Sequence, residues 1–312
     1  MRKTVLESVH RLARLDPRVV FIGSDLGAGV LAEMKAEMPE RFFMEGVAEA
    51  HVIGMAAGLA LDGFLPYLNT IATFITRRGY EQVALDLCLH DVPVRLIASG
   101  GGTVYAPLGP THMAIEDIAT MRALPNMTVV APADANEMTQ FMNRTLDWAH
   151  PIYIRLAKGS DPIVTGVDEP FEIGRAKPMR AGEDVGFVTT GIMTGRALAA
   201  AESLAASGVN AAVLHVPTIK PLDTEAILGL ARSTRLLVSV EEHSLIGGLG
   251  TAVLETLSDA GAATPVVRLG LRDAFIHSYG SQNDVLAAAG LDAPSIAAAV
   301  AARLGATLVR AS

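Results

Sequence analysis

Residues 46–60 of the chain read Gly-Val-Ala-Glu-Ala-His-Val-Ile-Gly-Met-Ala-Ala-Gly-Leu-Ala. From Val52 to Ala60 every residue is apolar or glycine. Small residues of this kind let a helix approach its neighbours closely, so we expect a buried helix here. A carboxylate at its start is costly to ionise unless a partner stabilises the charge. Glu49 therefore either faces water and is stabilised by the helix dipole, or serves a ligand that needs a buried proton partner.

Buried strands alternate with helices on both sides of this segment. Apolar runs of about five residues are typical of strands covered on both faces, and helical periods lie between them. The alternation predicts an α/β protein of two doubly wound domains, each with a mainly parallel sheet flanked by helices. The expected strands are 19–23, 92–98, 152–156, 185–190, 211–216 and 236–240, and expected helices are 3–15, 195–207 and 224–231.

The division between the two domains follows from a change in composition. Residues 161–182 are rich in Gly, Pro and Asp and hold few apolar runs, which indicates a linker with short strands. We therefore expect one domain over residues 1–160 and a second over 183–312. A chain of 312 residues is long enough for both.

Charge and composition limit the classes of partner. The net charge is −8 and no Lys/Arg-rich run is present, so we expect neither nucleic acid nor an anionic membrane as a partner. A single cysteine, Cys88, excludes an intrachain disulfide framework and a cysteine metal cluster. The N-terminus has no apolar core typical of a signal peptide, and no apolar run approaches the ~20 residues of a membrane span. These features favour a soluble, cytoplasmic protein.

Polar and glycine-rich stretches follow several expected strands, at the edge where open α/β sheets bind ligands. Ser24-Asp25-Leu26-Gly27 follows the first strand, although an aspartate there is also a common turn former. Ser99–Thr103 contains three glycines, but no Lys-Ser/Thr follows them, so a P-loop is not expected. His112 ends the stretch Gly109-Pro110-Thr111-His112, and taken alone it would more often be a loop or helix-capping residue.

In this order, the stretches resemble thiamine diphosphate enzymes of the transketolase and deoxyxylulose-phosphate synthase superfamily. The resemblance covers essentially the whole chain, as a pyrimidine-binding domain followed by a transketolase C-terminal domain. The segments that carry it are Gly46–His51, Thr73–Phe74 with Arg77 and Tyr80–Gln82, Gly109–His112 with Ile115–Asp117, Leu124–Asp134 and Glu241–Gly250. For the last segment we favour a structural role, in which glycines permit close helix–strand packing and His243 lies at a domain or subunit interface.

The resemblance implies roles for several residues in cofactor binding. Glu49 would hydrogen-bond a ring nitrogen of the aminopyrimidine and so activate the cofactor. Phe74, Arg77 and Tyr80 would pack against the same ring, because aromatic faces suit a flat heterocycle, although core packing is the alternative for a lone Phe. Asp25 would lie near the cofactor. Residues 66–74, which include Phe74, read as a strand and then a turn, and a helix opens at Thr76.

Three further residues would contact the substrate. The resemblance places His112 over the reactive thiazolium, against substrate hydroxyls, and makes it the second catalytic residue with Glu49. Arg155 ends a strand, and its planar fork suits a phosphate. Arg2 has the spacing of a second phosphate-binding arginine, although an N-terminal arginine is also commonly a solvated charge.

A motif of the family is absent from the sequence. The family holds the cofactor's diphosphate through a divalent metal bound by Gly-Asp-Gly and a downstream Asn, and this chain has no Gly-Asp-Gly. No metal ligand is therefore expected in this chain. The resemblance implies a split enzyme in which an N-terminal subunit holds Mg²⁺ or another divalent cation. With a second copy of this chain, the assembly would be an α2β2 heterotetramer.

Three departures concern the substrate. Where sugar-phosphate transketolases have a serine, a histidine and an aspartate, this chain has Gly29, Gly100 and Leu108. The expected reaction is transfer of a two-carbon ketol unit from a ketose, expected to be phosphorylated, to an aldehyde. Alternatives are a deoxyxylulose-phosphate-synthase-like condensation, the β subunit of a 2-oxo acid dehydrogenase, or a non-catalytic scaffold subunit. The Gly-Pro-Thr-His stretch argues against the dehydrogenase, and a buried Glu49 argues against the scaffold.

Overall fold

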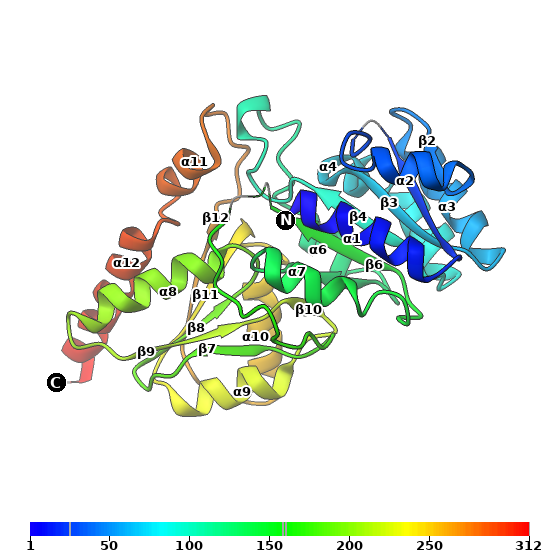
Figure 1. The fold of residues 1–312 in the computed structure, drawn as a ribbon. Helices are drawn as coiled ribbons and strands as arrows, with labels where there is room; N and C mark the ends of the chain where they lie inside the picture. Colours follow the sequence, from blue (N-terminus) through cyan, green and yellow to red (C-terminus); the bar gives the residue numbers. More distant parts are fainter. Residues whose placement is uncertain (25, 158, 160, 312) are drawn as a thin grey trace.

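Two α/β units lie side by side in the computed structural model, which describes residues 1–24, 26–157, 159 and 161–311, with side chains through residue 305 (Figure 1). Each unit is built around its own mainly parallel sheet, with helices on both faces. The fold class expected from the sequence is therefore confirmed. The N-terminus lies close to the junction of the two units, whereas the C-terminal helix lies at the far end of the second (Figure 1).

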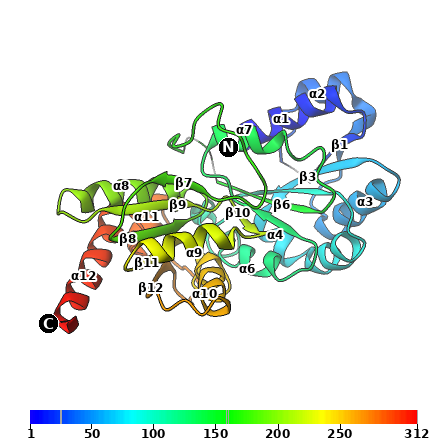
Figure 2. The ribbon, with the colours of Figure 1, turned by 90° about the horizontal axis from the view of Figure 1, so that it is seen from below.

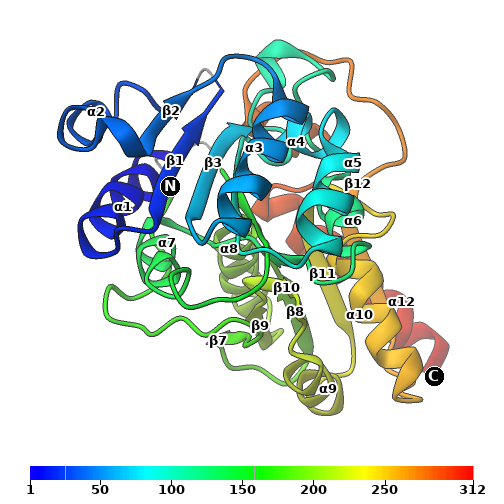
Figure 3. The ribbon, with the colours of Figure 1, turned by 90° about the vertical axis from the view of Figure 1, so that its right-hand side faces the viewer.

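The first sheet has seven strands in the order β10-β5-β6-β4-β3-β1-β2, all parallel to their neighbours except β10. Its strands are covered on both faces, because each lies between two hydrophobic layers. Helices α1 (Arg2–Leu15) and α7 (Ala135–Met142) cover one face, and α3 (Glu49–Leu61) and α6 (Asp117–Arg122) cover the other (Figure 3). The strands are β1 Val19–Gly23, β2 Phe42–Met44, β3 Leu65–Ile71, β4 Arg95–Ser99, β5 Thr128–Val130, β6 Ile152–Leu156 and β10 Thr218–Lys220.

The segment after β3 differs from the expected strand and turn. Helix α4 (Ala72–Arg77) begins directly after Ile71, so Phe74 lies on a helix. Ala72 and Ile75 are both buried at helical spacing, and this burial outweighs the strand preference of the surrounding β-branched residues. After a break, α5 (Tyr80–Gln82) leads into a π-helix over Val83–Leu89. Gly79 lies at the break, where a Cβ would overlap the Ile53 side chain of α3.

The second sheet has five strands in the order β12-β11-β8-β9-β7, with only β7 antiparallel to its neighbour. Helices α8 (Met193–Ala205) and α12 (Ala293–Ala311) cover one face, and α9 (Thr224–Ser233) and α10 (Leu249–Asp259) cover the other (Figure 2). The strands are β7 Lys177–Arg180, β8 Val185–Thr189, β9 Ala211–His215, β11 Leu237–Ser244 and β12 Val266–Leu271. Strand β7 lies within the residues that the sequence pattern assigned to the linker.

The two units share a strand and a buried ionic cluster. Strand β10 leaves the second unit and pairs antiparallel with β5 of the first sheet. Nearby, Glu137 of α7 is fully enclosed, 2.8 Å from His215 Nε2 and 3.1 Å from Lys177 Nζ. Burial alone would raise the pKa of Glu137, but His215 and Lys177 outweigh it and lower that pKa to about 2. The units are therefore joined by buried main-chain pairing and by charge.

One stretch, Gln282–Gly305, is long and apolar enough to cross a membrane by length and composition, and 28% of its apolar window is buried. This differs from the expectation that no run approaches that length. The chain turns after α11 (Gln282–Ala288) and resumes as α12, so the stretch is divided into two helices. Ile296 and Val300 of α12 pack into the core of the second unit.

Candidate active site

Glu49 is the first residue of α3 and is buried, with 6% of its surface exposed. Its Oε1 atom is enclosed and has no hydrogen-bond partner within the described part of the chain. The interpretation in which Glu49 faces water is therefore wrong. A buried acceptor without a donor costs about 1–3 kcal/mol, so this oxygen is suited to an N–H group supplied from outside the chain.

Phe74 and His112 lie together. Their ring centroids are 5.3 Å apart at an interplanar angle of 67°, an edge-to-face contact between α4 and the loop that follows β4. His112 Nδ1 lies 2.9 Å from Thr111 Oγ1, and the His112 amide donates to Gly109 O at 3.0 Å. Both rings are half-buried. The structure thus unites two residues that are far apart in the sequence into one partly exposed aromatic surface.

Arg77 holds the loop that carries His112. Its guanidinium pairs with Glu116 and donates through Nη2 to Met113 O at 3.1 Å and through Nη1 to Pro110 O at 3.4 Å. All three nitrogens therefore contact the loop, and contact with a cofactor stays a prediction for Arg77. Tyr80 is half-buried, and its hydroxyl donates to Thr120 O of α6 at 3.1 Å.

Arg155, at the end of β6, bridges the two units. Its Nε donates to Asp117 Oδ2 at 2.7 Å, and its Nη2 donates to Glu242 O at 2.8 Å and to Ala114 O at 3.3 Å. Burial lowers the pKa of Arg155, but the Asp117 carboxylate outweighs that effect and raises it, so the guanidinium stays charged. Since Nε and Nη2 are already engaged, binding of a substrate phosphate by Arg155 stays a prediction.

Arg2 is the first residue of α1 and is exposed. Asp25 lies outside the described residues. Gly29 and Leu108 are exposed, whereas Gly100 is buried at φ 81° against the Tyr105 ring. None of these three residues brings a polar side-chain group to its position.

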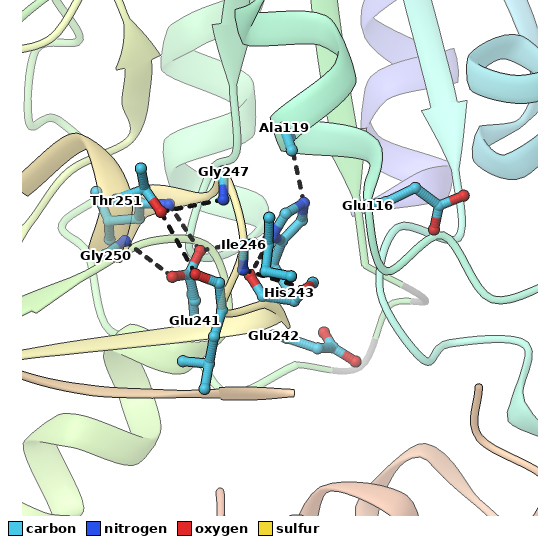
Figure 4. Close-up of polar contacts among 12 residues, drawn as sticks. Glu116, Ala119, Glu241, Glu242, His243, Ile246, Gly247, Gly250 and Thr251 are labelled. Carbon is cyan, nitrogen blue, oxygen red and sulfur yellow. Dashed lines mark hydrogen bonds and ion pairs between the residues drawn. The ribbon is translucent and has the colours of Figure 1, made fainter. Parts of the chain in front are cut away.

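Glu241 and His243, near the end of β11, contact two different helices. Glu241 accepts from Leu249 N at 2.7 Å and Gly250 N at 2.8 Å, and so caps the start of α10 (Figure 4). Burial raises the pKa of Glu241. His243 Nε2 accepts from Ala119 N of α6 at 3.2 Å, which confirms the expected place of this histidine at a domain interface.

Two residues of the second unit reach the His112 loop, and no local sequence pattern predicts their contacts. Glu242 accepts from Thr103 at the start of that loop, through N at 2.8 Å and Oγ1 at 2.6 Å. The Tyr279 ring lies against Gly109, where a Cβ would be 3.2 Å from the ring. Among the described residues, no group of three or more His, Cys, Asp or Glu is arranged to hold a metal ion.

Residues 1–162 match the family described as transketolase, pyrimidine binding domain, and residues 174–296 match transketolase, C-terminal domain. The chain belongs to the transketolase family. It is 38% identical over 276 residues to the 6-deoxy-6-sulfo-D-fructose transketolase subunit SqwH of Clostridium sp. (strain MSTE9), which covers 88% of this chain and 85% of that protein.

Two further comparisons place the chain within transketolase-family architecture. The chain is 36% identical over 307 residues to 1-deoxy-D-xylulose-5-phosphate synthase of Synechococcus sp. (strain JA-2-3B'a(2-13)), covering 97% of this chain and 47% of that enzyme. It thus spans about half the length of this synthase. A solved structure titled "Split gene transketolase, inactive beta4 tetramer" superposes with a TM-score of 0.87 and 37% identity, covering 96% of both chains.

Proposed function

We propose that this transketolase-family chain is the C-terminal (β) subunit of a split, thiamine-diphosphate-dependent transketolase. The reaction is transfer of a two-carbon ketol unit from a ketose to an aldehyde. The observation that carries the proposal is the enclosed Oε1 of Glu49, which has no partner in the described chain. A folded protein keeps such a costly acceptor where a ligand supplies the donor.

The elements around Glu49 support the same site. Strands β2, β3 and β4 run parallel within one sheet, and their carboxyl ends lead respectively to Glu49, to Phe74 and to the loop with His112. Ligands of open α/β sheets bind at this edge. The three residues therefore follow strands that end at the same edge of the sheet, although they are up to 63 residues apart in the sequence.

Each residue has a chemical task in this proposal. Glu49 accepts a hydrogen bond from a pyrimidine ring nitrogen and holds the proton there. Phe74 and Tyr80 cover the ring and exclude water, which strengthens that bond. His112 donates to or accepts from substrate hydroxyls. Thiamine diphosphate, when bound, supplies the carbanion-stabilising thiazolium.

The diphosphate and its Mg²⁺ are assigned to a separate N-terminal subunit, because the sequence lacks Gly-Asp-Gly. A similar chain is named a transketolase subunit, and another was solved as an inactive tetramer of β chains, which agrees with partner dependence. We propose an α2β2 assembly with two copies of this chain, located in the cytoplasm. Only with the partner is the pocket around Glu49 complete.

The substrate is proposed to be an anionic ketose. Exposed Arg2 is available to its anionic group, whereas Arg155 is largely engaged by the protein. Gly29, Gly100 and Leu108 remove polar contacts of the sugar-phosphate pocket, so the anion need not be a phosphate. A similar chain is named for a sulfosugar substrate, which makes a sugar sulfonate the second compound to assay after a sugar phosphate.

Reconstitution with the diphosphate-binding partner tests the function. The complete assembly, given a ketose donor and an aldehyde acceptor, should yield a new ketose two carbons longer than the acceptor and an aldehyde two carbons shorter than the donor, in a cofactor-dependent reaction. Product from a 2-oxo acid donor with release of CO₂ would instead identify the synthase-like alternative, for which the similarity to the synthase is the supporting observation. No turnover with any donor, despite cofactor binding, would favour the scaffold alternative.

A further inference from the structure

Three consecutive glycines, Gly100–Gly102, lie between β4 and the loop that carries His112. Each makes room for a different side chain. A Cβ at Gly100 would overlap the Tyr105 ring, one at Gly101 would overlap the Arg155 side chain, and one at Gly102 would overlap the Glu242 carboxyl group. Two of these side chains, Arg155 and Glu242, thus enclose the base of the His112 loop.

The base of the loop is closed by main-chain pairing. Gly102 N donates to Ala114 O at 2.8 Å, and Ala114 N donates to Gly102 O at 3.0 Å. Residues 103–113, including His112, are therefore confined to a loop whose two ends are held together. Each end also bonds a charged side chain: Thr103 donates to the Glu242 carboxylate, and Ala114 O accepts from the Arg155 guanidinium.

The second unit holds the base of the loop through the side chain of Glu242, which is charged and accepts from Thr103. Glu241 and Glu242 project from β11 in opposite directions (Figure 4). Glu241 is directed to α10, and Glu242, with 2% of its surface exposed, is directed to Thr103. Gln282 of α11 donates to both Glu242 oxygens, at 2.8 and 3.0 Å.

We propose that Glu242 is a positioning residue that fixes the His112 loop and thereby holds the His112 ring against Phe74. All its side-chain neighbours named above are donors, so its carboxylate makes charge-assisted bonds, which are the stronger kind. The second unit thus acts on the active site through one buried carboxylate. The inference rests on the proposed function only for the catalytic meaning of the His112 position.

An exchange of partners tests this geometry. Glu242→Gln leaves one oxygen for Thr103 but places an amide opposite the Gln282 amide, so that donor meets donor. Adding Gln282→Glu supplies an acceptor for that amide, so a hydrogen bond between residues 242 and 282 forms again, with its direction reversed and with the same net charge as the parent. The matched control is Glu255→Gln, which makes the same substitution at another pair between the units, Arg122–Glu255.

Hydrogen–deuterium exchange of the isolated chain measures the loop directly. We expect the amides of Gly102, Thr103 and Ala114 to exchange about tenfold faster in Glu242→Gln, to return toward the parent rate in the double variant, and to be unchanged in the control. The His112 imidazole resonances should shift and return in parallel. Exchange at the parent rate in folded Glu242→Gln, or no recovery in the double variant, would overturn the proposal.

Two additional measurements keep the result decisive. If Glu242→Gln does not fold, Thr103→Val removes the Oγ1 bond alone and should accelerate the same amides by a smaller factor; parent-like exchange would overturn the proposal. In the complete enzyme, kcat should fall in Glu242→Gln and recover in the double variant, with cofactor affinity unchanged. Accelerated exchange with parent-like kcat would leave the positioning by Glu242 intact and contradict the role proposed for His112.

Discussion

Replacing Glu49 by glutamine should leave the stability of the isolated chain nearly unchanged but remove most activity of the complete enzyme. The Oε1 atom has no donor among the described residues, so the nearly isosteric amide breaks no observed hydrogen bond. An unpartnered buried polar group costs about 1–3 kcal/mol, and the amide leaves such a group in the same place, so this cost is present in both proteins. We therefore expect the free energy of unfolding of the isolated chain to stay within about 1 kcal/mol of the parent, a change in Tm of roughly 2 °C or less.

The same substitution should remove most activity from the complete enzyme. Glutamine cannot hold the proton that Glu49 is proposed to hold at the pyrimidine, and general acid–base groups contribute about 10²–10⁴-fold to rate. The assay is the rate at which the cofactor's reactive carbon exchanges its proton for deuterium, with kcat measured alongside. Glu45→Gln, an exposed glutamate in the same segment, is the matched control and should behave like the parent.

Two results would contradict the role and the environment described for Glu49. Exchange and kcat at the parent level in Glu49→Gln would show that Glu49 does not activate the cofactor. A fall in Tm of many degrees would show that the carboxylate has a structural partner in the folded chain, so that its buried oxygen could not be taken as a vacant acceptor for a ligand.

The remaining predictions concern the buried charges between the two units. The pKa of Glu137 is lowered from 4.5 to about 2, so the free energy of unfolding that this carboxylate contributes is fully present above pH 4.5 and falls by about 3 kcal/mol as the pH falls toward 2. Urea unfolding at several pH values should show a smaller dependence of stability on pH in Glu137→Gln than in the parent. An equal dependence in both proteins would contradict this prediction. Arg155→Ala leaves the Asp117 charge buried and should destabilise the chain by about 3–5 kcal/mol, with partial recovery when Asp117→Asn is added. A parent-like Tm with a KM raised only for phosphorylated substrates would instead assign Arg155 to the phosphate.

Much of the strand framework could be predicted from local sequence. Strands β1 and β6 have the expected limits, because short runs of β-branched residues bounded by turns are unambiguous when both faces are covered. The sequence predicts a strand and a turn for the stretch that contains Phe74, yet tertiary burial of Ala72 and Ile75 makes a helix that begins at Ala72. Helix α12 was not identified, because an alanine-rich end has little amphipathic contrast.

The candidate site could be predicted only as separate stretches. The identities of Glu49, Phe74 and His112 are local, and the structure shows the latter two in contact. The environment of Arg155 is not local, since Asp117 and Glu242 lie 38 and 87 residues from it in the sequence. The need for glycine at 100–102 likewise cannot be predicted locally, because it depends on which side chains pack against these three residues.

Calorimetric titration of thiamine diphosphate with Mg²⁺ tests the claim that this chain contributes only the pyrimidine side of a shared site. The titration is made into the chain alone, into its Gly-Asp-Gly-bearing partner alone, and into their equimolar mixture. We predict tight, stoichiometric binding and ketol transfer only in the mixture, with weak or no binding to this chain alone. Tight binding with turnover by the isolated chain, or a mixture that neither binds nor turns over, would contradict the claim.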